Sequence, residues 1–188
     1  MRARAALRIV IQFAVFQLAW LACVLGAAHG QVVAGVACVG VVVGLHLALS
    51  DARAIECALI AMAVILGLGW DTAMIAFGVV GYASPGAFPW LAPLWILALW
   101  ALFATLLCSP LSWLHGRPFL AAVLGAVGGP LSYLAAVRLG AGNFTDQTSA
   151  LLILAVGWAV LTPVLTESAH WMLGRCSQAY GDRQIRLT

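Results

Sequence analysis

The chain has 188 residues, of which 64% are hydrophobic and only 8% are charged. A soluble domain carries about 25% charged residues, and a disordered chain is poor in apolar residues, so the composition excludes both classes. The nine basic residues are all arginines, scattered between apolar stretches without a continuous basic patch, so we expect no nucleic-acid partner. The composition predicts an integral membrane protein.

Six apolar runs follow one another along the chain, each long enough to cross a membrane. Their approximate bounds are 9–28, 32–49, 55–82, 90–108, 118–138 and 149–171. The first run is about 20 residues long, longer than the 7–15 apolar residues of a signal peptide, so we expect it to be retained as a helix. We therefore predict one domain, 1–188, that is all-α: an integral membrane bundle of six transmembrane helices.

The arginines indicate how the bundle is oriented. Six crossings place eight of them on one face of the membrane and Arg138 alone on the other. Splitting the third run at Asp71 into two crossings would distribute them about equally, so the positive-inside rule selects six helices with both termini cytoplasmic. Tyr82 and Trp90 then lie at the outer edge, where an aromatic belt is expected.

Two glycine pairs predict close contacts between helices. Gly40 and Gly44 form a GxxxG motif in the second run, and Gly125 and Gly129 form another in the fifth. In lipid, small residues at this spacing let two helix backbones approach closely, so we expect both pairs at helix interfaces.

Asp71 is the strongest candidate for a functional residue, because a carboxylate inside a membrane is energetically expensive. It precedes the outer end of the third run by about 11 residues, or about 16 Å of helix, which places it near the bilayer centre. Three interpretations stay open: a carboxylate that binds a ligand or relays protons, a hydrogen-bonded acid that holds helices together, and a cap on a half-helix after a break at Gly67-Leu-Gly69. Gln17, deep in the first run, is a candidate donor to Asp71.

The fifth run contains an irregular segment around Pro130, which removes one backbone donor and frees a carbonyl one turn earlier. Helix breaks at membrane depth are tolerated where protein or a water-filled cavity satisfies the backbone, and in transporters they often form the substrate site. An ordinary proline kink is the alternative. On the first interpretation, a ligand cavity is lined by Asp71, Gln17, Gly128, Gly129, Pro130, Ser132 and Tyr133.

A second polar group is expected near the cytoplasmic face, formed by His46, Arg117, Glu167 and His170. Glu167 and His170 are three residues apart on one helix face, the ligand spacing of di-iron bundles, but those proteins need two such motifs. Pairing of Glu167 with an arginine such as Arg117 is the main interpretation. A zinc ion held by His46, Glu167 and His170 is the alternative. We assign no metal, no cofactor and no catalytic residue.

Segments of the fourth and fifth runs resemble a known family. They are Ala92-Pro-Leu-Trp-Ile-Leu-Ala-Leu-Trp-Ala-Leu-Phe-Ala-Thr-Leu-Leu with Ser112-Trp113-Leu114, and Leu124-Gly-Ala-Val-Gly-Gly-Pro-Leu-Ser-Tyr133 with Arg138-Leu-Gly-Ala141. Over most of its length the chain is similar to a bacterial family of small inner-membrane proteins classed only as a domain of unknown function, without assigned catalytic residues. Its members are often encoded beside fatty-acid-modifying, methyltransferase-like enzymes. The resemblance implies the bacterial inner membrane, a membrane lipid and a lipid-modifying enzyme partner.

These features together predict a protein that binds a lipid or a small apolar molecule in an intramembrane cavity, as a transporter or as a partner of a lipid-modifying enzyme. Two alternatives belong to other classes. One is an intramembrane metal-dependent enzyme that uses the His46, Glu167 and His170 group. The other is a structural membrane subunit without a site.

Overall fold

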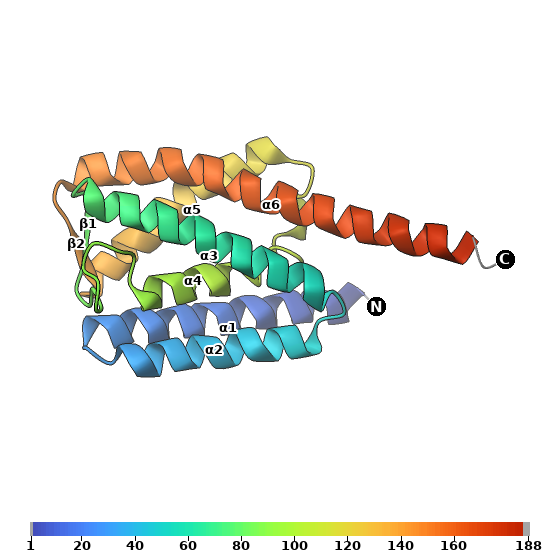
Figure 1. Cartoon of the computed structure of the whole chain (residues 1–188), viewed down its shortest axis with the longest axis horizontal. Helices are drawn as coiled ribbons and strands as arrows, with labels where there is room; N and C mark the ends of the chain where they lie inside the picture. The colour runs from blue at the N-terminus through green and yellow to red at the C-terminus, as the bar shows by residue number, and fades with distance from the viewer. Residues whose placement is uncertain (1, 186–188) are drawn as a thin grey trace.

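Six helices run back and forth along one axis, and a two-stranded ribbon joins the ends of two of them (Figure 1). The computed structural model describes the backbone of residues 2–185 and the side chains of residues 6–175. The elements are α1 (Arg2–Ala28), α2 (Val32–Leu49), α3 (Arg53–Ala76), β1 (Val80–Tyr82), α4 (Leu94–Ala104), the 3-10 turn η1 (Ser112–Leu114), α5 (Pro118–Arg138), β2 (Gly142–Phe144) and α6 (Gln147–Ile185). The predicted helical membrane bundle is confirmed, and five of its helices are long and apolar enough to span a membrane.

The bundle has two distinct ends. α1 begins and α6 ends at one of them, called here the terminal end, while β1 and β2 lie at the other, the ribbon end (Figure 1). Because the helices alternate in direction, Arg53 and Arg117 lie at the terminal end and Arg138 lies at the ribbon end. This is the distribution of arginines that six passes require.

The fourth pass differs from its prediction as a spanning helix over 90–108. α4 has 11 residues and is about 16 Å long, whereas a spanning helix needs about 20 residues. Pro93 directly precedes α4 and Pro110 follows it, and both prolines are buried. Irregular backbone at membrane depth is tolerated where protein covers it, as it does the largely buried segment 105–110 after α4. A short helix followed by this buried segment therefore replaces the expected long one.

The end of the third run is also corrected, because residues 77–82 leave the helix. Gly78 adopts φ +64°, and its N–H and that of the next residue donate back to the last turn of α3 at 2.9 Å. This is a Schellman motif, and α5 ends in the same way at Gly140, where φ is +90°. The segments that follow the two motifs pair as β1 and β2, antiparallel, with Gly81 opposite Asn143.

The two GxxxG motifs have different outcomes. Gly125 and Gly129 pack tightly on α6: a Cβ on Gly125 would lie 2.2 Å from the carbonyl oxygen of Trp158, and one on Gly129 would lie 2.2 Å from Trp158 Cγ. A Cβ on Gly40 or Gly44 would meet nothing within 4 Å. The prediction of a close interface is therefore confirmed for α5 and wrong for α2.

Candidate functional site

Asp71 is fully buried and accepts hydrogen bonds from side chains of three other elements. Trp100 Nε1 of α4 donates to Oδ2 at 2.7 Å, and the Tyr133 hydroxyl of α5 donates to Oδ1 at 2.6 Å. The Tyr82 hydroxyl of β1 donates to the same Oδ1. Burial and the neighbouring Asp71 carboxylate raise the pKa of Tyr82, which lies outside the spanning helices, well above its ordinary value, so this hydroxyl keeps its proton. One carboxylate thus joins α3, α4, α5 and β1.

This geometry corrects three expectations about Asp71. α3 is continuous through Gly67, so the predicted break and half-helix cap are wrong. The partners of Asp71 are two tyrosines and a tryptophan, and Gln17 is not among them. Finally, α3 ends only five residues after Asp71, or about 7.5 Å along the helix, because Gly78 ends it early. Asp71 lies toward the ribbon end instead of midway along the bundle.

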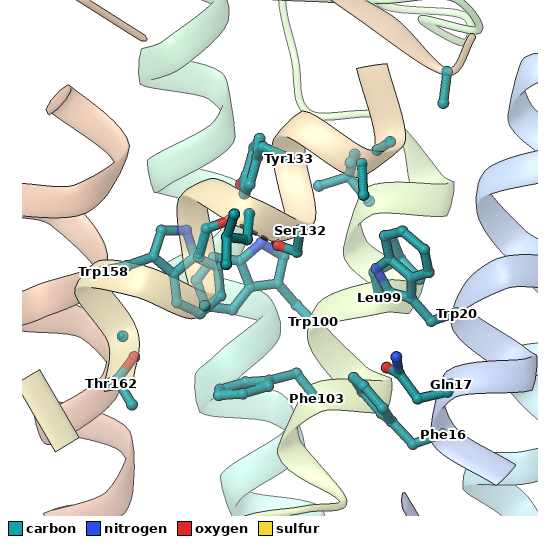
Figure 2. A pocket seen from close by; sticks show the side chains of 18 of the residues that line it. Phe16, Gln17, Trp20, Leu99, Trp100, Phe103, Ser132, Tyr133, Trp158 and Thr162 are labelled. Carbon is teal, nitrogen blue, oxygen red and sulfur yellow. Dashed lines mark hydrogen bonds between the residues drawn. The ribbon is translucent and has the colours of Figure 1, made fainter. Parts of the chain in front are cut away.

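A cleft of about 490 Å³ adjoins this carboxylate, with α1 on one side, α5 on the other and α4 at its floor. Figure 2 shows Gln17 of α1 across the cleft from Ser132 of α5. Nine aromatic side chains line it: three from α1, three from α4, and Tyr82, Tyr133 and Trp158; no lining residue is charged. Its volume and apolar lining are those of a small-molecule site, for which about 300–1,000 Å³ is usual.

The cleft opens through the side of the bundle. Phe13 on α1, and Leu124 and Leu131 on α5, line the cleft and are also exposed on the surface of the molecule. Both helices are apolar and long enough to span a membrane, so the opening between them faces hydrocarbon. A molecule dissolved in the lipid would reach the cleft sideways without crossing water.

Five of the seven residues predicted to line a ligand cavity line this cleft. They are Gln17, Gly128, Gly129, Ser132 and Tyr133. Their role in ligand binding stays a prediction.

Asp71 and Pro130 do not line the cleft. Asp71 is separated from it by the rings of its three partners, which do line it. Pro130 is buried within α5, which continues through it as one helix, so the interpretation as a broken helix is wrong.

Trp100 and Trp158 are the central residues that the sequence analysis missed, and Tyr82 was assigned to an aromatic belt. The two tryptophan rings stack at 4.8 Å between centroids with 11° between their planes. Trp100 fits against Gly67, four residues before Asp71, and Trp158 fits against Gly129, four residues before Tyr133. A glycine one turn before a membrane-embedded polar residue is the signal that could have indicated both.

The predicted polar group near the terminal end is divided, because His46 has another partner. His46 Nε2 in the last turn of α2 lies 2.5 Å from Glu56 Oε2 in the first turn of α3. Within residues 6–175, no three His, Cys, Asp or Glu side chains are placed to hold a metal ion together. The zinc site of His46, Glu167 and His170 is therefore wrong.

Glu167 and His170 instead face the connection between α4 and α5. Glu167 Oε1 accepts a hydrogen bond from the backbone N–H of Gly116 at 3.0 Å, and the His170 ring lies 5.5 Å from that of His115. The expected pair of Glu167 with Arg117 is not formed in the part of the chain whose side chains are described. Glu167 thus anchors the loop between η1 and α5 to α6.

Comparison with known proteins identifies a family. The family model described as "Protein of unknown function (DUF2878)" matches residues 9–164. No curated protein and no solved structure matches the chain. The matched range contains every residue that lines the cleft or bonds Asp71.

Proposed function

We propose that this chain, which belongs to that family of unknown function, binds a lipid or another small apolar molecule in the cleft between α1 and α5. The supporting observation is a cleft of about 490 Å³ with an aromatic, uncharged lining that opens between exposed apolar side chains of α1 and α5. The proposal places the chain in the bacterial inner membrane with its arginine-rich terminal end in the cytoplasm.

The chemistry of the lining supports an apolar ligand. Aromatic rings provide large apolar contact areas, and no arginine, lysine or histidine lines the cleft to pair with a phosphate group. Gln17 and Ser132 are polar lining residues that could orient a ligand. A ligand bound here stays accessible from the side of the bundle, where a membrane-bound lipid-modifying enzyme, the proposed partner, would reach it.

Filling the cleft tests this proposal. Gly128 is an exposed residue of α5 that lines the cleft, and a Cβ at this position would meet nothing within 4 Å. We therefore expect Gly128→Leu to be accommodated and its side chain to narrow the cleft. Gly40→Leu is the matched control, because Gly40 is an exposed helix glycine with equally open space outside the cleft. Native mass spectrometry of the proteins extracted from membranes should find a bound small molecule in the wild type and in Gly40→Leu.

The same measurement should find the bound molecule lost or strongly reduced in Gly128→Leu, with its thermal midpoint in detergent near that of Gly40→Leu. Equal occupancy in all three proteins, or an empty wild type, would contradict the proposal. Either result would favour a structural subunit without a site.

A further inference from the structure

We infer that the ligand of the cleft is a hydrophobic cation, whose apolar groups fill the aromatic cleft while its positive charge lies against the rings that bond Asp71. The inference rests on the proposed function, since it assumes that the cleft binds a molecule from the membrane. It adds the sign of the charge, which the lining residues alone do not determine.

The first observation is that the Asp71 carboxylate has no cationic partner within the described side chains. Its three partners are neutral donors, and three hydrogen bonds donated to one carboxyl group stabilise its ionised form. The five arginines within residues 6–175 are all exposed, and none of them pairs with Asp71. A buried carboxylate costs free energy unless it is paired, and its attraction for a positive charge is stronger in an apolar interior than in water.

The second observation is the position of the three partners between the carboxylate and the cleft. Tyr82, Trp100 and Tyr133 each bond Asp71 and also line the cleft, so a single side chain separates the acid from a bound molecule. A hydroxyl or N–H that donates to a carboxylate is polarised toward it, which enriches its ring in electrons. The Trp100 ring stacks on Trp158 and packs against Gly67, so the two tyrosine rings are the ones expected to meet a cation. Electron-rich tyrosine faces attract cations, and aromatic cages recognise quaternary ammonium groups.

The third observation is the charge of the lining itself. No lining side chain is positively charged, so nothing in the cleft repels a cation, and an anion finds no charged partner there. Other aromatic lining residues, among them Phe16, Trp20 and Phe103, provide apolar contact for the remainder of the molecule. Charge complementarity and apolar fit therefore point to the same occupant.

Two probes of nearly equal size and opposite charge test the inference on the unaltered protein. Tetraphenylphosphonium is the cation and tetraphenylborate is the anion, and binding of each to the full chain in detergent is measured by equilibrium dialysis. Gly128→Leu reports the uptake of each probe by the micelle alone. We expect saturable binding of the cation in the wild type, about tenfold or more tighter than that of the anion, and its loss in Gly128→Leu.

Equal binding of the two probes, preference for the anion, or saturable binding of neither would overturn the inference. If Gly128→Leu still empties the cleft of its natural molecule in the mass-spectrometry test, the proposed function stands while the charge assignment fails. If both tests fail, the cleft is not a site.

Removal of the negative charge provides a second, independent measurement. Asp71→Asn should weaken tetraphenylphosphonium binding about tenfold and leave tetraphenylborate binding unchanged or stronger. Asp51→Asn, at an exposed carboxylate in the turn before α3, is the matched control and should bind like the wild type. Unchanged cation binding in a folded Asp71→Asn protein would overturn the inference. If that variant does not fold, the two-probe comparison on the wild type decides.

Discussion

At the residue scale, the main feature is a carboxylate whose hydrogen-bonding needs are met by aromatic side chains. In an apolar interior an unsatisfied donor costs about 1–3 kcal/mol, so the acid and its donors depend on one another. Tyr82, Trp100 and Tyr133 bring apolar rings as well as donors, so the same side chains bond the acid and cover it. Asp71 therefore holds α3, α4, α5 and β1 together near the ribbon end of the bundle, whether or not it also has a role in binding.

Asp71→Ala should lower stability strongly, because it leaves the buried Trp100 N–H and two half-buried tyrosine hydroxyls without their acceptor. We expect a loss of about 3 kcal/mol or more in the free energy of unfolding. Tryptophan fluorescence during thermal unfolding in detergent measures the effect, since Trp100 itself bonds Asp71. Asp51→Ala is the control and should unfold with the wild type. A midpoint for Asp71→Ala equal to that of the wild type would mean that the three bonds contribute no net stability.

At the element scale, helices are held together where a tryptophan of one helix meets a glycine of another. Trp100 of α4 lies on Gly67 of α3, and Trp158 of α6 lies on Gly129 of α5. Trp70 of α3 lies on Gly157 of α6 in the same way, where an added Cβ would come within 1.9 Å of the ring. Association of helices in lipid relies on such van der Waals fit, because burial of apolar surface drives little there.

Gly125→Ala tests this kind of contact at a place where the neighbour cannot move cheaply. The added methyl group would lie 2.2 Å from the backbone oxygen of Trp158, so α5 and α6 must separate, at a cost of about 1–3 kcal/mol. Gly44→Ala is the matched control in open space and should be neutral or stabilise the helix by up to about 1 kcal/mol. Thermal midpoints in detergent compare the two, and an equal effect of both changes would contradict the interface.

At the scale of the whole molecule, the short α4 forms the floor of the cleft. Its 11 residues lie between α1 and α5, and its aromatic side chains line the opening (Figures 1 and 2). The ribbon of β1 and β2 closes the bundle at one end, while α1 and α6 carry the chain ends at the other. With six passes, the ribbon end and the terminal end are expected on opposite faces of the membrane.

Single cysteines placed at the two ends of the bundle should label from opposite sides. Ala87 is exposed in the loop between β1 and α4 at the ribbon end, and Ser112 is exposed in η1 toward the terminal end. In a background without the native cysteines, a membrane-impermeant maleimide should label Ala87→Cys in intact spheroplasts. Ser112→Cys should react only after permeabilisation, because the arginine-rich end is expected inside. Labelling of both from the same side would contradict the six-pass arrangement.

The membrane class, the six helices and the alternation of their ends are determined by the sequence itself. In hydrocarbon each backbone must satisfy its own hydrogen bonds, so apolar runs become helices wherever they occur. Local signals such as Gly78 and Pro93 also mark where α3 ends and α4 begins, although the predicted third and fourth runs are longer than these helices.

Only the tertiary structure decided which residues bond Asp71, which of the two GxxxG pairs lies at a helix interface, and whether a cleft exists. Tyr82, Trp100 and Tyr133 are far apart in the chain, and helix periodicity says which residues share a face but not which helix that face meets. In lipid, hydrophobicity does not distinguish a neighbouring helix from the solvent. The choice among faces is therefore made by shape and hydrogen bonding, which exist only once the helices have packed.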